Sequence, residues 1–369
     1  MSKLGIARQI AAVGAHVARE HVTKPMAVRP TDVPRGPQAL TAEWLTAVLC
    51  TQVPGAHVVA FTLGEAHSGT TARGRIELTY DSAGQAAGLP ASVWFKATPT
   101  LTTRLVSGLT EASQNEGRFY IQIRPDLELL SPQGYHAAAD PSSGRTFVLI
   151  EDVGRTRNAR FAADLSWIAS ALQWQQKVNA RMPFEKRTLI GIDRAADVCA
   201  PGFLDRRTEV WPAFIRSLEL NVGGPTTLLH QDTHAGNWFN TPDGEMGLYD
   251  WQCMARGCWA LDVAYAFMSG LTVEDRRAWE YELLDYYLHL LREAGGEPPE
   301  FDVAWTLYRQ QVFHGLAFWL ITIGAGRFQP DMQPVEISRV NLQRMTHAVM
   351  DLDSFAALNE PRGDHVRAL

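Results

Sequence analysis

The chain has 369 residues, of which 46% are hydrophobic and 20% are charged, and its formal net charge is −6. This length allows two domains or two lobes with a substantial core, and the acidic balance argues against a general nucleic-acid binder, which would carry a basic face. No apolar run approaches the ~20 residues needed to cross a bilayer. The four cysteines lack the spacing of a zinc site and are typical of reduced thiols, so we expect a cytoplasmic protein.

The first 22 residues predict an amphipathic helix, because Ile6, Ile10, Val13 and Val17 lie on one helical stripe. The segment lacks the unbroken apolar stretch of a secretory signal. We expect the helix to dock on the body of the protein or on a partner chain, which leaves a homodimer open. A membrane-surface helix is the weaker alternative, since the apolar side is mostly alanine.

A proline-rich connector follows at 24–38, and Thr41 is the expected N-cap of a short helix. Strand-like patterns then run from about 56 to 151, and we expect the first strand to stop at Gly64. The expected elements of this region are strands at 56–65, 73–81 and 92–99, a helix from about Leu105 to Ile121, and a strand at 145–153. They predict a twisted antiparallel sheet with one helix packed on it.

From about residue 160 onward the periodicity becomes helical. The segment 301–324 is apolar around most of its circumference and should form one buried central helix. Two short strands, at 226–230 and 245–250, interrupt the helices. The chain therefore predicts an α+β fold, with a β-rich N-terminal lobe and a mostly helical C-terminal lobe.

Polar residues cluster where each of these two short strands ends, first in His230-Gln-Asp232-Thr-His-Ala-Gly-Asn237 and then at Asp250. Phosphoryl transfer requires a carboxylate that takes the proton of the attacking hydroxyl, and oxygen ligands for Mg²⁺. The spacing from Asp232 to Asn237 equals that of the kinase catalytic loop H-R-D-x-x-x-x-N, which a metal-binding aspartate follows. Asp232 would be the base, and Asn237 and Asp250 the metal ligands. The alternative is a turn held by Asp and Asn side-chain hydrogen bonds.

Other parts of such a site occur upstream in the required order. The small-residue loop Ser68-Gly69-Thr70-Thr71 would let backbone N–H groups approach phosphate oxygens, although a plain hairpin turn is the more common meaning. Lys96 lies in an apolar strand, where an unpaired ammonium is costly, so we expect it to point into a cleft and bind phosphates. An outward-facing surface lysine is the alternative.

Glu116 lies on the following helix and is the expected ion-pair partner of Lys96, as in the lysine–glutamate pair of kinases. Glu111 is the rival. Glu116 is preferred because its helix continues into the apolar pair Phe119-Tyr120.

The strand that leads to Glu151 and Val153 ends where the two lobes would join. Its backbone is the expected partner of a nucleotide base, with Val148 or Ile150 packed near the ring. Any buried strand would show the same pattern.

The segment HQDTHAGNWF…LYDWQ resembles the HGDxHxxN…(I/L)DW pattern of the aminoglycoside phosphotransferase / choline kinase-like family, a branch of the protein-kinase-like fold. The resemblance covers about residues 40–355. NEGRFY is similar to the ExxFY helix of the ecdysteroid-kinase-like and acyl-CoA-dehydrogenase-associated branches. The resemblance implies a bilobal fold, with Asp232 as base, Asn237 and Asp250 on Mg²⁺, and Lys96 on the nucleotide phosphates.

The same resemblance implies that Asp262 is a buried aspartate that stabilises the catalytic loop and takes no part in the chemistry. The chain departs from the family at two places. Gln231 stands where the family usually has glycine, and the loop HSGTTARG does not match the GxGxxG of protein kinases.

Only twelve positions separate Asp250 from Asp262, which leaves no room for a long activation segment on which a peptide could lie. We therefore expect ATP-dependent transfer of the γ-phosphate onto a hydroxyl of a small molecule, with GTP and the identity of the acceptor left open. No nucleic-acid partner is expected. The expected domains are an N-terminal helix and connector (1–40), a nucleotide-binding lobe (41–153), and a lobe with the catalytic loop and acceptor site (154–369).

Two other functions compete with this prediction. One is a catalytically weak, kinase-like protein that binds nucleotide as a regulator. The more remote one is a metal-dependent hydrolase, because His230, Asp232 and His234 spell HxDxH. A metal-dependent hydrolase needs further ligands on separate elements, and the other histidines form no second cluster.

Overall fold

The computed structural model describes residues 3–69, 71–127, 129–152, 169–179, 183–241, 243–326 and 332–361. These residues form two compact units. The first contains the described residues before 153, together with 238–253 and Met332, and the second contains the described residues of 169–237, 254–326 and 333–361. No helix among the residues described is both long enough and apolar enough to span a membrane.

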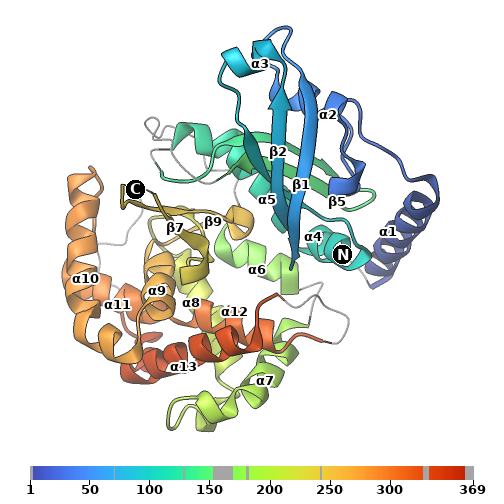
Figure 1. The fold of residues 1–369 in the computed structure, drawn as a ribbon. Helices are drawn as coiled ribbons and strands as arrows, with labels where there is room; N and C mark the ends of the chain where they lie inside the picture. The colour runs from blue at the N-terminus through green and yellow to red at the C-terminus, as the bar shows by residue number, and fades with distance from the viewer. Residues whose placement is uncertain are drawn as a thin grey trace. The chain divides into compact units, whose positions relative to one another are not determined.

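The first unit is built on a five-stranded antiparallel sheet with the strand order β1-β2-β3-β5-β4, shown in Figure 1. Its strands are β1 (Val58–Ser68), β2 (Ala72–Tyr80), β3 (Ser92–Ala97), β4 (Gly134–Asp140) and β5 (Arg145–Glu151). Burial alternates along most of β2, as expected for a sheet with one face on the core. Ile76, Phe95 and Phe147 are completely buried on that face.

The first strand does not stop at Gly64, which corrects the sequence prediction. β1 continues to Ser68, and its pairing with β2 shifts register between Leu63 and Ala66. A bulge of this kind inserts an extra residue and interrupts the alternation, which is why the strand-like pattern in the sequence ends there. The predicted small-residue loop is therefore the tight connection between β1 and β2.

Helices of different lengths accompany the sheet. They are α1 (Lys3–Thr23), α2 (Ala42–Leu49), α3 (Ser82–Ala86), α4 (Leu101–Thr110) and α5 (Ala112–Arg118), with the turns η1 (Pro37–Ala39), η2 (Phe119–Ile123) and η3 (Arg124–Asp126). Thr41 is the N-cap of α2, as predicted, and its Oγ1 accepts a hydrogen bond from the Trp44 amide at 3.1 Å. Trp44 is fully buried and meets Phe147 edge to face.

The single helix predicted from Leu105 to Ile121 is two helices, α4 and α5. The chain breaks at Glu111, whose φ of 60° is left-handed. An L-residue in this conformation cannot continue a right-handed helix, and no glycine marks the position in the sequence. The prediction was therefore wrong about continuity and correct about the helical content.

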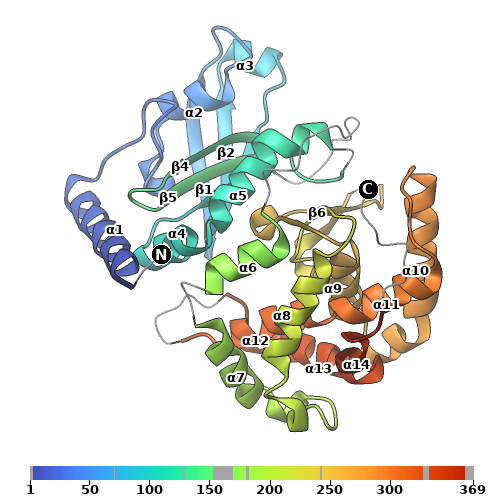
Figure 2. The same cartoon turned by 180° about the vertical axis from the view of Figure 1, so that it is seen from behind.

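The N-terminal helix docks on the body of this unit, beside α4 (Figure 2). Glu20 accepts two hydrogen bonds from the Arg104 guanidinium, at 3.0 and 2.6 Å, and both side chains are buried. Arg104 also donates to Thr98 O at 3.1 Å, two residues beyond Lys96. A buried bidentate pair of this kind attaches α1 and α4 to the end of β3.

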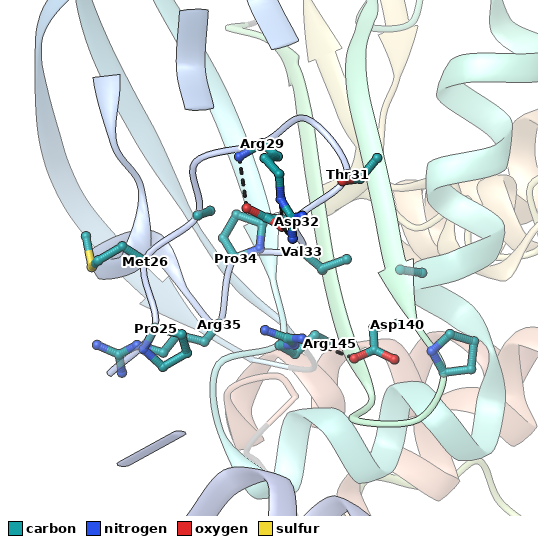
Figure 3. A pocket seen from close by; sticks show the side chains of 13 residues that line it. Pro25, Met26, Arg29, Thr31, Asp32, Val33, Pro34, Arg35, Asp140 and Arg145 are labelled. Carbon is teal, nitrogen blue, oxygen red and sulfur yellow. Dashed lines mark hydrogen bonds and ion pairs between the residues drawn. The ribbon is translucent and has the colours of Figure 1, made fainter. Parts of the chain in front are cut away.

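The connector 24–38 borders a pocket of about 510 Å³ against the β4–β5 turn (Figure 3). Two ion pairs line it, Arg29 with Asp32 at 2.9 Å and Arg145 with Asp140 at 3.1 Å. Backbone N–H groups and Arg29 lower the pKa of Asp32 to about 2. These pairs largely compensate the charge of the pocket wall.

The second unit is mainly helical. Its elements are α6 (Ala171–Asn179), α7 (Phe184–Arg194), η4 (Ala196–Val198), η5 (Leu204–Arg206), α8 (Val210–Asn221), β6 (Thr227–Leu229), η6 (Ala235–Asn237), β9 (Ala255–Gly257), α9 (Ala260–Gly270), α10 (Val273–Glu293), α11 (Phe301–Gln311), α12 (Phe313–Ile323), α13 (Val335–Asp351) and α14 (Ser354–Ala357). The segment 301–324, predicted as one helix, is divided at Val312 into α11 and α12. Val312 keeps helical dihedral angles, so periodicity alone does not reveal the division.

The α+β class predicted from the sequence is confirmed, since an antiparallel sheet characterises one unit and helices the other. The hairpin β7 (Trp238–Asn240) and β8 (Met246–Leu248), followed by η7 (Trp251–Cys253), belongs to the first unit although it lies late in the chain. The domain boundaries 1–40, 41–153 and 154–369 stay a prediction.

Replacement of Glu20 by alanine should destabilise the protein by about 3–5 kcal/mol, because Arg104 would be left buried without its carboxylate. Urea unfolding of the full chain measures this loss. The control is Glu219→Ala, which breaks the exposed Arg216–Glu219 pair and should cost less than about 1 kcal/mol. Equal losses in the two variants would show that the buried pair contributes nothing special.

Candidate active site

Lys96 lies in the middle of β3, between β2 and β5, and is only 3% exposed. Its Nζ is 2.6 Å from Glu116 Oε1 and 2.8 Å from Asp250 Oδ1. A buried ammonium is tolerated only when it is paired, so the strand, α5 and the segment after β8 must meet at this point. The predicted Lys96–Glu116 pair is present, and the surface-lysine alternative is wrong.

Two carboxylates, those of Glu116 and Asp250, surround the Lys96 ammonium in this cluster. Burial alone would lower the pKa of Lys96, but Asp250 and Glu116 raise it above its ordinary value. Burial, opposed by Lys96, raises the pKa of Glu116. Arg73 supplies a second cation, since its guanidinium is 3.9 Å from Asp250 Oδ2 and its side chain is 43% exposed.

Asp250 is held in a strained conformation, with a left-handed φ of 71°. Its amide donates to Tyr120 Oη at 3.2 Å, and the neighbouring Trp251 stacks on Phe119 with ring centroids 4.0 Å apart. In addition, the Leu248 amide donates to Leu130 O at 2.8 Å. The aromatic pair after Glu116 thus positions Asp250, a role that the sequence analysis missed.

The small-residue loop is less informative. Ser68 is the last residue of β1, the Gly69 amide donates to Thr71 O at 3.0 Å, and Thr70 lies outside the described residues. That amide is therefore already engaged within the loop. Nucleotide binding by Ser68, Gly69 and Thr70 stays a prediction.

The strand expected to contact the nucleotide base ends at Glu151, the last residue of β5. The Glu151 amide donates to Gln133 O at 2.8 Å, and its carboxylate accepts from the Gln133 amide at 3.1 Å. This amide is therefore already used within the unit. Val153 lies outside the described residues, and base binding by Glu151 and Val153 stays a prediction.

The loop from His230 to Asn237 belongs to the second unit, where Asp262 holds its backbone. The Asp262 carboxylate accepts from the amides of His230 at 2.7 Å and Gln231 at 2.8 Å. The Thr233 hydroxyl donates to Asp262 O at 2.8 Å. Burial raises the pKa of Asp262 to about 7, against these two amides, which lower it. The structural role expected for Asp262 is therefore present.

The backbone conformation at Gln231 is one that favours glycine. It is completely buried and has a left-handed φ of 63°, a conformation that glycine adopts without strain. Its carbonyl oxygen is 2.8 Å from His314 Nε2. His314 is buried, and its Nδ1 has no hydrogen-bond partner among the described residues, so the neutral ring donates from Nε2. The sequence analysis missed His314, whose place in an apolar helix was the only signal.

Asp232 has its two carboxylate oxygens in different surroundings. Oδ1 accepts from the Tyr265 hydroxyl at 3.0 Å, and Oδ2 is 3.9 Å from His234 Nε2. The Asp232 carbonyl accepts from Asn237 Nδ2 at 2.7 Å. Tyr265, three residues after Asp262, was not predicted to take part in the site.

Asn237 and Asp250 are the predicted Mg²⁺ ligands. The Asn237 amide nitrogen is used within the loop, so its amide oxygen remains for a ligand. Asp250 belongs to the cluster with Lys96 and Glu116. Each residue by itself offers the hard oxygen donor that Mg²⁺ prefers, and Mg²⁺ binding by Asn237 and Asp250 stays a prediction.

The HxDxH segment has a different arrangement from a zinc site. His230 Nδ1 accepts from the Asp232 amide at 3.2 Å, and His234 Nδ1 accepts from the Gly236 amide at 3.0 Å. Across the part of the chain that the structure describes, no three or more His, Cys, Asp and Glu residues are grouped as a metal site. The loop uses its histidines as hydrogen-bond acceptors for its own backbone.

A model of the phosphotransferase enzyme family matches residues 104–300, more than half of the chain. The chain belongs to this family. The matched range includes Glu116, Asp232, Asn237 and Asp250. The resemblance inferred from the motifs is thereby confirmed, as is the bilobal, kinase-like α+β class, and the coarse chemistry is transfer of a phosphoryl group.

Several solved structures resemble this family member weakly. A microcompartment-associated aminopropanol kinase is 14% identical, with 80% of this chain and 92% of that chain covered and a TM-score of 0.47. A Plasmodium vivax ethanolamine kinase is 11% identical, with 78% and 81% covered and a TM-score of 0.42. The choline kinase LicA from Streptococcus pneumoniae is 14% identical, with 80% and 94% covered and a TM-score of 0.39. No curated protein matched the chain.

Lys96→Met and Glu116→Gln should each destabilise the protein, but the double variant should lose less than the two losses together. Each single variant leaves buried charge without its partner, and the double removes both members of the pair. Urea unfolding of the four proteins gives the coupling energy, expected between about 0.5 and 3 kcal/mol. The same cycle on Arg216 and Glu219, an exposed pair, is the control. Additive losses at Lys96 and Glu116 would contradict the expectation.

His314 should make stability depend on pH. Burial lowers the pKa of His314 from 6.5 to about 4, so folding excludes its protonated form. The stability that it contributes is complete above about pH 6.5 and is lost as the pH falls toward 4, at up to about 1.4 kcal/mol per pH unit. Urea unfolding between pH 4 and 8 compares the wild type with His314→Gln, which keeps a donor but does not titrate. Identical pH profiles would contradict the prediction.

Proposed function

We propose that the chain transfers the γ-phosphate of ATP to a hydroxyl group of a small molecule, with Asp232 as the base and Asn237 and Asp250 as ligands of Mg²⁺. The observation that carries this proposal is the buried ammonium of Lys96 between Glu116 and Asp250. In a member of a phosphotransferase family, a buried lysine held in this way is suited to neutralise phosphate oxygens.

The reaction follows from the groups that the chain supplies. The acceptor hydroxyl gives its proton to the Asp232 carboxylate, and its oxygen forms a bond to the γ-phosphorus. The bond from that phosphorus to the bridging oxygen breaks, and ADP leaves. The positive charge of Lys96 neutralises part of the negative charge of the phosphates, and Mg²⁺ would supply further neutralisation when it is bound. Asp262 keeps the loop of Asp232 in one conformation through two backbone amides.

The proposal of a small acceptor rests on the short segment after Asp250. Within twelve positions the chain forms η7 and β9 and then enters α9, which contains Asp262. β9 pairs with β6 directly before the Asp232 loop. Most of this segment is in regular secondary structure, so little chain remains on which a peptide could lie.

The acceptor need not be a polycationic antibiotic. The Glu280 carboxylate, on α10, is engaged in an internal network, because it accepts hydrogen bonds from buried Arg276 at 2.7 Å and from the Tyr308 hydroxyl at 2.9 Å. Asp351 pairs with Arg276 and Arg277. These acids already have cationic partners within the chain. We therefore propose a hydroxylated metabolite as the acceptor class, with an aminoglycoside as one member to test.

The proposed setting is the cytoplasm. All four cysteines are free thiols, and Cys50, Cys253 and Cys258 are buried. Buried unpaired thiols are typical of a reducing compartment.

The test is a screen of hydroxylated metabolites and aminoglycosides with ATP and Mg²⁺, read by the mass shift of the phosphorylated acceptor. Asp232→Asn should lower turnover by about 10²–10⁴-fold, with nucleotide binding retained. The matched control is Asp205→Asn, at an exposed aspartate far from the loop in sequence, which should keep full turnover. Robust phosphorylation of a protein panel with no small-molecule product would overturn the acceptor class. Nucleotide binding without any transfer would favour the regulator instead.

A further inference from the structure

We infer that His234 and Asp232 together bind the acceptor hydroxyl, with His234 Nε2–H donating to the oxygen that attacks the phosphate. This inference rests on the proposed function and adds a second catalytic residue to it. It also makes Tyr265 a positioning residue, since the Tyr265 hydroxyl orients the Asp232 carboxylate.

The Gly236 amide fixes the tautomer of His234. The Gly236 amide donates to His234 Nδ1 at 3.0 Å, so the lone pair of Nδ1 is engaged. A neutral imidazole has one donor and one acceptor nitrogen, and the proton therefore resides on Nε2. A Cβ at position 236 would lie 2.9 Å from His234 Cε1 and 3.0 Å from Nδ1. Only glycine permits this close approach, which makes the arrangement a feature of the loop sequence.

An aromatic contact fixes the orientation of the His234 ring. His234 is 9% exposed and meets Trp319 edge to face, with centroids 5.4 Å apart and planes at 68°. Trp319, on α12, is itself buried. The aromatic contact and the Gly236 hydrogen bond hold the imidazole from two sides, so the direction of Nε2–H is defined before any substrate binds.

The distance between His234 Nε2 and the Asp232 carboxylate leaves room for one oxygen atom between them. His234 Nε2 is 3.9 Å from Asp232 Oδ2, which is too long for a direct hydrogen bond. One oxygen atom can lie about 2.7–2.9 Å from both groups at once, which are ordinary hydrogen-bond distances. Tyr265 occupies Oδ1 at 3.0 Å, so Oδ2 is the oxygen that is left to take the proton.

The hydroxyl of an acceptor satisfies both groups. It donates its proton to Asp232 Oδ2, and one of its lone pairs accepts from His234 Nε2–H. Its other lone pair forms the bond to the γ-phosphorus, while the bond to the leaving nucleoside diphosphate breaks. The Nε2–H bond stays intact, so His234 orients the nucleophile and Asp232 alone takes the proton. Such positioning accounts for much of the catalysis in phosphoryl transfer.

The experiment compares His234→Phe, which removes the donor, with His234→Gln, which keeps an N–H near the position of Nε2. Two acceptors serve as probes: a hydroxyl compound phosphorylated in the screen, and water, read as phosphate released from ATP and Mg²⁺. His234→Phe should lower kcat/KM for the acceptor by about 10–100-fold, with ATP affinity unchanged. His234→Gln should recover part of this loss. Tyr265→Phe should lower kcat and leave the KM for ATP unchanged, since it removes the hydrogen bond that orients the Asp232 carboxylate.

A second measurement does not depend on turnover. In ¹⁵N-histidine-labelled protein, the resonances of His234, assigned by their loss in His234→Gln, should show a neutral ring protonated at Nε2. A ring protonated at Nδ1 would overturn the inference. This measurement remains decisive if His234→Phe fails to fold.

The outcomes separate the two proposals. If Asp232→Asn abolishes transfer and folded His234→Phe keeps it, the proposed function stands and the role of His234 is wrong. If the wild type phosphorylates no acceptor and releases no phosphate, the proposed function fails, and the role of His234 fails with it. If His234→Phe weakens ATP binding and acceptor turnover alike, His234 maintains the loop only, which also overturns the inference.

Discussion

The buried ammonium of Lys96 is the constraint on which the first unit depends. An ammonium at 3% exposure requires compensating charge, and the two carboxylates that supply it come from positions 20 and 154 residues further along the chain. α5 must therefore pack on the sheet, and the β7–β8 hairpin must join a unit that is otherwise formed by the N-terminal part of the chain. Tyr120 and Trp251 complete this arrangement, because they hold the backbone and flank of Asp250.

The second unit solves a similar problem with backbone amides in place of an ammonium. Asp262 is half-buried close to Asp232, and two consecutive N–H groups of the loop bond to its carboxylate. For both amides to point at one carboxylate, the chain turns through a left-handed residue at Gln231. Gln231 and Asp250 are both strained non-glycine residues in candidate catalytic segments. Strain of this kind persists only where surrounding contacts determine the conformation, and His314 and Tyr120 provide such contacts here.

These contacts also decide which atoms remain for a substrate. Tyr265 uses one oxygen of Asp232, Gly236 uses one nitrogen of His234, and the Asp232 carbonyl uses the amide nitrogen of Asn237. The atoms that are left are a carboxylate oxygen, an N–H donor and an amide oxygen. In the proposed function, these atoms serve as an acceptor for a proton, a donor for an oxygen and a hard ligand for a metal. A site with preorganised groups of this kind spends little energy on reorganisation during the reaction.

Sequence alone determined the features that depend on residue type and local spacing. These are the strand alternation, the lysine within an apolar strand, the choice of Glu116 as the partner of that lysine, and the Asp232–Asn237 interval. Each can be predicted because burial and chemistry restrict the residue at that position. Only the tertiary structure decided the helix break at Glu111, the bulge near Gly64, the division of 301–324 and the roles of Tyr265 and His314. From sequence alone, a tyrosine or histidine in an apolar helix is interpreted as a core residue, because the group that it contacts is not known. Those partners lie more than 30 residues away, and local pattern contains no information about contacts at that separation.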